Sequence, residues 1–91
     1  MQIPITHQTQ SCRFESEIEG HLCVLSYRMR EGVMVIFSTR VPAEVGGRGI
    51  AAELTRVALE TARAQGWRVE PLCPYVAAYI NRHQEYRELT A

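Results

Sequence analysis

The stretch that decides the fold reads GGRGIAAELTRVALETARAQG, residues 46–66. From Ile50 to Ala64 its apolar residues recur at intervals of three and four, which is typical of one face of an α-helix. These apolar residues are Ile50, Ala51, Leu54, Val57, Ala58 and Ala62. Gly66 follows, and glycine commonly ends a helix at its C-terminal side. The stretch therefore predicts one long amphipathic helix that a glycine-rich loop precedes.

Alternation before this helix predicts antiparallel strands. Polar and apolar residues alternate from Cys12 to Ile18 and again from His21 to Arg30, with the turn Glu19-Gly20 between them. A two-residue turn there would pair Ile18 with His21 and Ser16 with Cys23. After a second turn at Glu31-Gly32 comes a β-branched run, Val33 to Phe37, which favours a third strand.

The residues after the long helix predict a strand and a second helix. Polar and apolar residues alternate from Trp67 to Leu72, a stretch bounded by Gly66 and Pro74. Pro74 suits the first position of a helix. The apolar stripe of that helix is Val76, Tyr79, Ile80 and His83. A strand–helix–strand unit makes its two strands parallel with a right-handed crossover. We therefore expect an α/β fold of the α+β kind: a three-stranded antiparallel meander, a helix, a parallel fourth strand and a C-terminal helix.

Length and charge limit the class of protein. The 91 residues make one small domain, for which we expect a loose lead-in or an edge strand over 1–11 and a folded unit over 12–91. Within that unit, residues 84–91 look like a polar tail, with Tyr86 and Leu89 packing back. Ten Arg balance ten Glu, so there is no basic footprint for nucleic acid. No apolar run is long enough to cross a membrane, which favours a cytoplasmic protein. The oligomeric state stays open, with a monomer favoured.

Three cysteines and three histidines are candidates for chemistry. The cysteines lack the C-x-x-C spacing that would suggest a metal site. Alternation places Cys12 and Cys23 on the inward faces of their strands, as core thiols. Cys73 differs, because it precedes the second helix, and a helix N-terminus lowers the pKa of a thiol. A buried, inert Cys73 is the alternative. We expect the histidines to be solvated, apart from a structural one on the second helix.

The loop Gly46–Ala51 predicts a phosphate site. Glycines that lead into a helix expose N–H groups at the positive end of the helix dipole, and Arg48 adds a full charge. Both predicted helices start at the carboxyl ends of parallel strands, which places this loop and Cys73 at one edge of the sheet. The alternative is a flexible turn whose glycines only permit the entry to the helix.

Several runs resemble a known family. Thr39-Arg40-Val41-Pro42, Gly47-Arg48-Gly49-Ile50-Ala51 and Cys73-Pro74-Tyr75-Val76, followed by Tyr79-Ile80, resemble the minimal YjdJ-type branch of the GNAT N-acetyltransferase superfamily. The similarity extends from about Cys12 to Leu89. It implies an acetyl-CoA site without a metal, in which Cys73 takes part in transfer. The implied cofactor-binding residues are Val41, Gly46, Gly47, Arg48, Gly49, Ile50, Ala51, Pro74 and Tyr75.

Two positions depart from the family pattern. Gly46 stands where the loop usually has Arg or Gln, and Ser38 stands where many members have a histidine. The resemblance implies a small acetyl-CoA-dependent N-acetyltransferase that acts on an unidentified amine, with Cys73 at the reacting centre. Two alternatives stay open: a coenzyme A-binding module with little turnover, and a non-enzymatic interaction domain.

Overall fold

A computed structural model describes residues 3–91 and contains a five-stranded sheet in the order β1-β2-β3-β4-β5. The first four strands pair antiparallel, each with the next along the chain: β1 (Thr6–Gln8), β2 (Arg13–Ile18), β3 (His21–Arg30) and β4 (Val33–Arg40). The last strand, β5 (Arg68–Pro71), runs parallel to β4. The helices are α1 (Ile50–Gln65) and α2 (Pro74–Arg82), with short 3₁₀ helices η1 (Ala43–Val45) and η2 (Gln84–Leu89). The expected α+β fold is therefore confirmed, and β1 adds a short edge strand to the meander.

The turn between β2 and β3 is the one that the sequence predicts. Ile18 pairs with His21 and Ser16 pairs with Cys23. Glu19 and Gly20 occupy its centre with φ angles of 51° and 79°. Positive φ at both central residues matches the right-handed twist of the flanking strands. The register of the hairpin follows from this turn, and it sends Phe14, Cys23 and Leu25 into the core.

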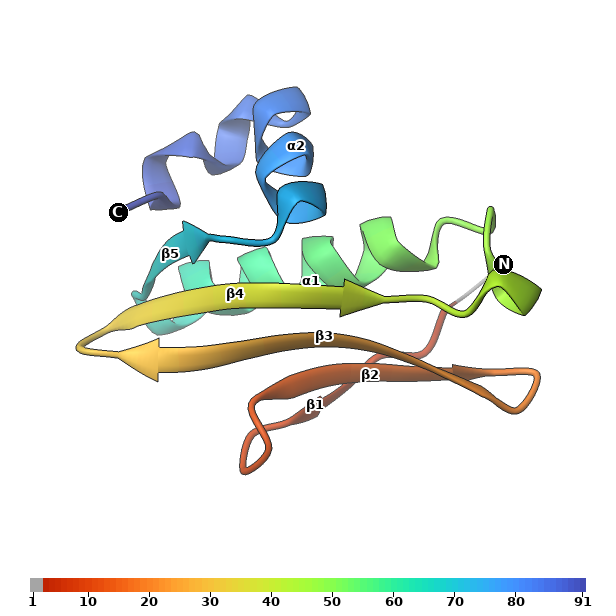
Figure 1. Cartoon of the computed structure of the whole chain (residues 1–91). Helices are drawn as coiled ribbons and strands as arrows, with labels where there is room; N and C mark the ends of the chain where they lie inside the picture. The colour runs from red at the N-terminus through yellow and green to blue at the C-terminus, as the bar shows by residue number, and fades with distance from the viewer. Residues whose placement is uncertain (1–2) are drawn as a thin grey trace.

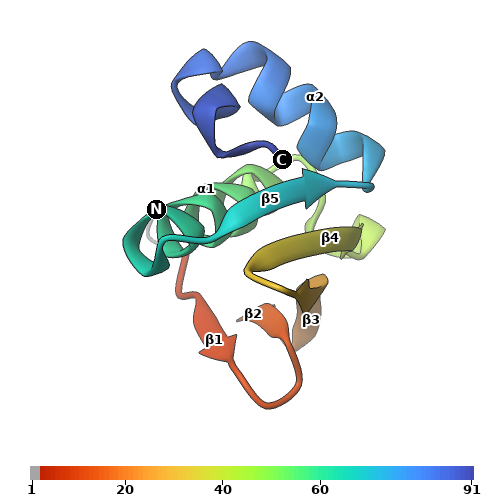
Figure 2. The ribbon, with the colours of Figure 1, turned by 90° about the vertical axis from the view of Figure 1, so that its left-hand side faces the viewer.

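The sheet curves around α1, and α2 lies beyond the β5 side of the sheet (Figures 1 and 2). Leu54, Ala58 and Leu59 of α1 are fully buried against the sheet. The chain after η2 closes the outer side of β5, where Thr90 forms a parallel bridge with Val69. One face of the sheet is thus covered by helices, which leaves Leu22 and Phe37 about half exposed.

Some predicted burial and boundaries are wrong in detail. Thr55 and Leu59 are fully buried, although they stand outside the predicted apolar stripe of α1. The β5 strand is two residues shorter than predicted, and Trp67 is a half-buried residue at the edge of the core. Met29 lies on the apolar side of the predicted alternation but is 37% exposed, because it stands beyond Ser26, where the pairing of β3 with β2 ends.

The C-terminal tail is ordered by packing. Tyr86 and Leu89 are buried, which confirms that they pack back onto the fold. The Tyr86 hydroxyl donates a hydrogen bond of 2.6 Å to Oε2 of Glu60 on α1. Desolvation and this carboxylate raise the pKa of Tyr86 to about 12. Residues 84–89 of the tail form the 3₁₀ helix η2.

His7 is not the solvated residue that the sequence suggests. Its Nε2 lies 2.6 Å from the hydroxyl oxygen of Tyr27, and its ring stacks on Phe14 with 4.0 Å between ring centroids. Partial burial lowers its pKa. His7 therefore anchors β1 to the sheet.

The two cysteines expected in the core differ in burial. Cys23 is fully buried, and desolvation raises the pKa of its thiol, whereas Cys12 is only half buried.

Candidate functional site

The parallel strands β4 and β5 part after four paired residues. Their pairing ends at Ile36 and Pro71, and the N–H groups of Leu72 and Cys73 both donate to the Ile36 carbonyl, each at 3.0 Å. On the other side of β4, Tyr27 pairs with Ile36 and Ser26 with Ser38, so Phe37 is the extra residue of a β-bulge. Within residues 3–91, no strand pairs with β4 on its β5 side beyond Ile36.

The glycine-rich loop leads into α1 without a side-chain cap. Gly49 is the N-cap residue, in the left-handed conformation with φ 80° and ψ 14°. The first hydrogen bond of the helix runs from the Glu53 N–H to the Gly49 carbonyl at 3.1 Å. The N–H groups of Ile50, Ala51 and Ala52 therefore have no partner within the helix. These donors and the positive end of the helix dipole favour an anion at this position.

The predicted loop residues differ in what they offer a ligand. Gly46, Gly47 and Gly49 are exposed. The side chain of Ile50 is buried in the core and only 2% exposed, so Ile50 offers a ligand only its N–H. Ala51 is half buried on the first turn of α1.

Arg48 is bound by a residue of another element. Its Nη1 and Nη2 donate to the two carboxylate oxygens of Glu19 at 2.8 and 3.2 Å. This pair lowers the pKa of Glu19 and raises that of Arg48. The sequence predicted the cation in the loop but not its carboxylate partner.

Cys73 lies at the point where β4 and β5 part. It is the N-cap residue of α2, directly before Pro74, and it is only 5% exposed. Its thiol donates to Oγ1 of Thr39 at 3.5 Å, in the unpaired part of β4. Tyr75 is half buried against the core. The structure therefore brings Cys73 next to Thr39, two residues before Val41.

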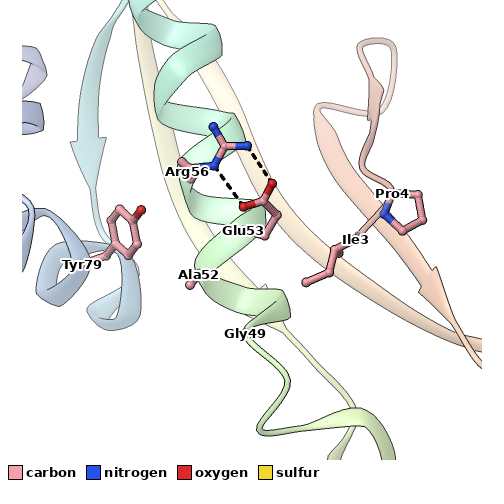
Figure 3. A pocket seen from close by; sticks show the side chains of 7 residues that line it. All are labelled: Ile3, Pro4, Gly49, Ala52, Glu53, Arg56 and Tyr79. Atoms are coloured by element: carbon pink, nitrogen blue, oxygen red, sulfur yellow. Dashed lines mark hydrogen bonds and ion pairs between the residues drawn. The ribbon is translucent and has the colours of Figure 1, made fainter. Parts of the chain in front are cut away.

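A groove of about 670 Å³ extends from the start of α1 along its outer side (Figure 3). It is lined by Ile3, Pro4, Gly49, Ala52, Glu53, Arg56 and Tyr79. Arg56 donates to both carboxylate oxygens of Glu53, from Nε at 3.0 Å and from Nη2 at 2.7 Å. This contact lowers the pKa of Glu53. Ala52, Glu53 and Arg56 were not predicted as site residues, although helical spacing from Gly49 places them on one face.

Val41 follows the end of β4 and lines a second cavity, of about 530 Å³. Its other lining residues are Leu22, Val24, Thr39, Arg40 and Pro42. Among residues 3–91, no group of three or more His, Cys, Asp or Glu side chains is arranged to hold a metal ion. No helix among them is long and apolar enough to cross a membrane.

Residues 13–89 match the model of the family Acetyltransf_CG, described as GCN5-related N-acetyl-transferase. The chain belongs to the GCN5-related N-acetyltransferase family. This GCN5-related chain is also similar to the solution structure of a GCN5-like protein from Staphylococcus aureus, provisionally assigned as an N-acetyltransferase. The TM-score is 0.77 at 20% identity, over 98% of this chain and 88% of the other, and this likeness shows the fold. No match was found among curated proteins.

In this GCN5-related chain, one edge of the sheet thus combines three features. They are the unpaired edge of β4 beyond Ile36, the uncapped N–H groups of α1, and the thiol of Cys73. Unpaired backbone groups can form hydrogen bonds, free N–H groups at a helix start favour anions, and a thiol has the chemistry of a nucleophile or an acid.

Proposed function

We propose that the chain binds acetyl-CoA at the parting of β4 and β5 and transfers the acetyl group to an amine. The observation that carries the proposal is the uncapped start of α1 beside the unpaired edge of β4. Family membership supports it, because acetyl-CoA is the usual acetyl donor in this family. The motifs at Gly47–Ala51 and Cys73–Val76 support assignment to the YjdJ-type branch.

The ligand's parts match different features of the site. We place the pyrophosphate on the loop Gly46–Ala51, where neutral N–H groups supply most of the hydrogen bonds. The pantetheine arm would follow β4 towards Val41, with Pro74 and Tyr75 at its other side. The nucleotide half would occupy the groove along α1, where Arg56 and Tyr79 offer a cation and an aromatic ring. Residues 12–91 would then form the binding domain.

The reaction involves two proton transfers: the leaving thiolate gains a proton, and the acceptor ammonium loses one. The amine attacks the thioester carbonyl, the carbon–sulfur bond breaks, and the coenzyme A thiolate leaves and takes up a proton. Cys73 serves in one of two ways: its thiol gives that proton, or its thiolate accepts the acetyl group first and passes it to the amine. Ser38 offers no imidazole at the position where many members have a histidine, and we place the loss of the ammonium proton in solvent.

A binding module with little turnover is the second candidate, and Ser38 favours it, because a serine stands there in place of the histidine of many members. Titration of the protein with coenzyme A by calorimetry tests binding, and absence of heat would support a non-enzymatic interaction domain. Intact-mass measurement after incubation with acetyl-CoA tests transfer. A gain of one acetyl group that disappears in Cys73→Ala supports the acyl-enzyme route, and modification of an added amine without that gain supports direct transfer.

We also propose a cytoplasmic location, because the three cysteines are free, as cysteines are in a reducing compartment.

A further inference from the structure

Glu19 is a carboxylate that lies against the proposed pyrophosphate loop. It occupies the tip of the β2–β3 hairpin, 29 positions before Arg48 in the chain, and binds both terminal nitrogens of that guanidinium. Bidentate contacts of this kind are the geometry that a phosphate group would also use with an arginine. Glu19 therefore occupies the hydrogen-bonding positions that Arg48 would offer to a ligand.

The pair leaves the loop with no net charge from its side chains. Arg48 is the only charged residue of the segment 46–49, and Glu19 cancels it. The Glu19 side chain is 64% exposed, and the hydrogen bonds that hold it among residues 3–91 are the two from Arg48, so it can rotate into water when they break. Exposed ion pairs are weak, so a polyanionic ligand can displace this one at a modest loss of affinity.

We propose that Glu19 is an affinity-determining residue: it is the counter-ion that an incoming pyrophosphate must displace from Arg48. The inference rests on the proposed function. Glu19 lowers the affinity of the loop for anions, and binding of the ligand breaks the contact between hairpin and loop. Acting through Arg48, Glu19 limits retention of coenzyme A, the product of the transfer, as well as binding of the substrate.

The test is calorimetric titration of coenzyme A and of inorganic pyrophosphate into wild type, Glu19→Gln and Glu17→Gln at low and moderate salt. Glu17 is the matched control, because it is an exposed glutamate of the same hairpin and has no ion pair among residues 3–91. We expect Glu19→Gln to bind both ligands about threefold to fivefold more tightly, the size of an exposed ion pair. Its affinity should fall more steeply with salt, because the loop gains one positive charge. Glu17→Gln should stay within twofold of wild type.

Glu19→Asn is a second variant for the same turn, because asparagine adopts the positive φ of this position readily. Equal or weaker binding by both Glu19 variants, with wild type binding normally, would overturn the inference and make Glu19 a residue that orients Arg48. An equal gain in Glu17→Gln would also overturn it, because general charge would then be the cause. If neither wild type nor variants bind coenzyme A, the proposed function fails first and the inference fails with it.

Discussion

Replacement of Gly49 by alanine separates the role of this glycine in the fold from its role in binding. Gly49 has φ +80°, and an added Cβ would meet no heavy atom within 4 Å. The stability loss therefore comes from backbone strain alone, about 1–2 kcal/mol for an alanine in the left-handed region. For a domain of this size, such a loss lowers the Tm by about 4–16 °C. The Cβ itself enters open space at the start of α1, where we place the pyrophosphate.

The expected loss of binding has a separate cause, because the Cβ blocks an N–H group that would bind the ligand. A charge-assisted hydrogen bond from an N–H group contributes about 1.5–3 kcal/mol, so blocking one of them weakens coenzyme A binding by at least about tenfold. Gly32→Ala is the matched control, because Gly32 has φ +81° and equally open surroundings in the β3–β4 turn. Both variants should lose similar stability in thermal unfolding. If calorimetry shows wild-type affinity for Gly49→Ala, the placement of the pyrophosphate is wrong.

Three further outcomes are expected. Cys73→Ala should bind coenzyme A within about threefold of wild type and lose acetyl transfer, and acetyl-CoA should slow alkylation of Cys73 in peptide mapping; unchanged alkylation would place the thioester elsewhere. Burial lowers the folded-state pKa of His7 below its ordinary 6.5, so its stability contribution is complete above pH 6.5 and is lost as the pH falls below that value. Urea unfolding at pH 7.5 and 5.5 should show this loss in wild type and less of it in His7→Gln. Tyr86→Phe removes the 2.6 Å bond to Glu60 and should lower the free energy of unfolding by about 1 kcal/mol; an unchanged urea midpoint would contradict that role.

The sequence predicts the features that depend on neighbouring residues. The β2–β3 register follows from the turn Glu19-Gly20, and the start of α2 follows from Pro74, because both are set by local backbone preferences. The same local reasoning predicts that Cys73 stands at the N-terminus of α2, and the structure places it there.

Features that depend on distant residues were not predictable in this way. His7 looked solvated because its partner Tyr27 lies 20 positions away, on a strand that β1 does not pair with. Arg48 looked free for the same reason, since nothing local indicates that a hairpin tip reaches the loop. The extra residue Phe37 does not disturb the β-branched pattern of β4, so the bulge becomes visible only in the pairing with β3.

The parting of β4 from β5 also bears on self-association. Beyond Ile36, β4 presents one side of its backbone without a strand partner among residues 3–91, and unpaired strand edges can pair with strands from other molecules. The side chain of Phe37, which is 47% exposed, adds apolar surface to this stretch, whereas the charge of exposed Arg40 opposes pairing with another strand. A ligand arm lying along the edge would occupy the same hydrogen-bonding groups. In the proposed binding mode, acetyl-CoA would therefore cover this edge and oppose aggregation, and concentrated samples without it would aggregate first.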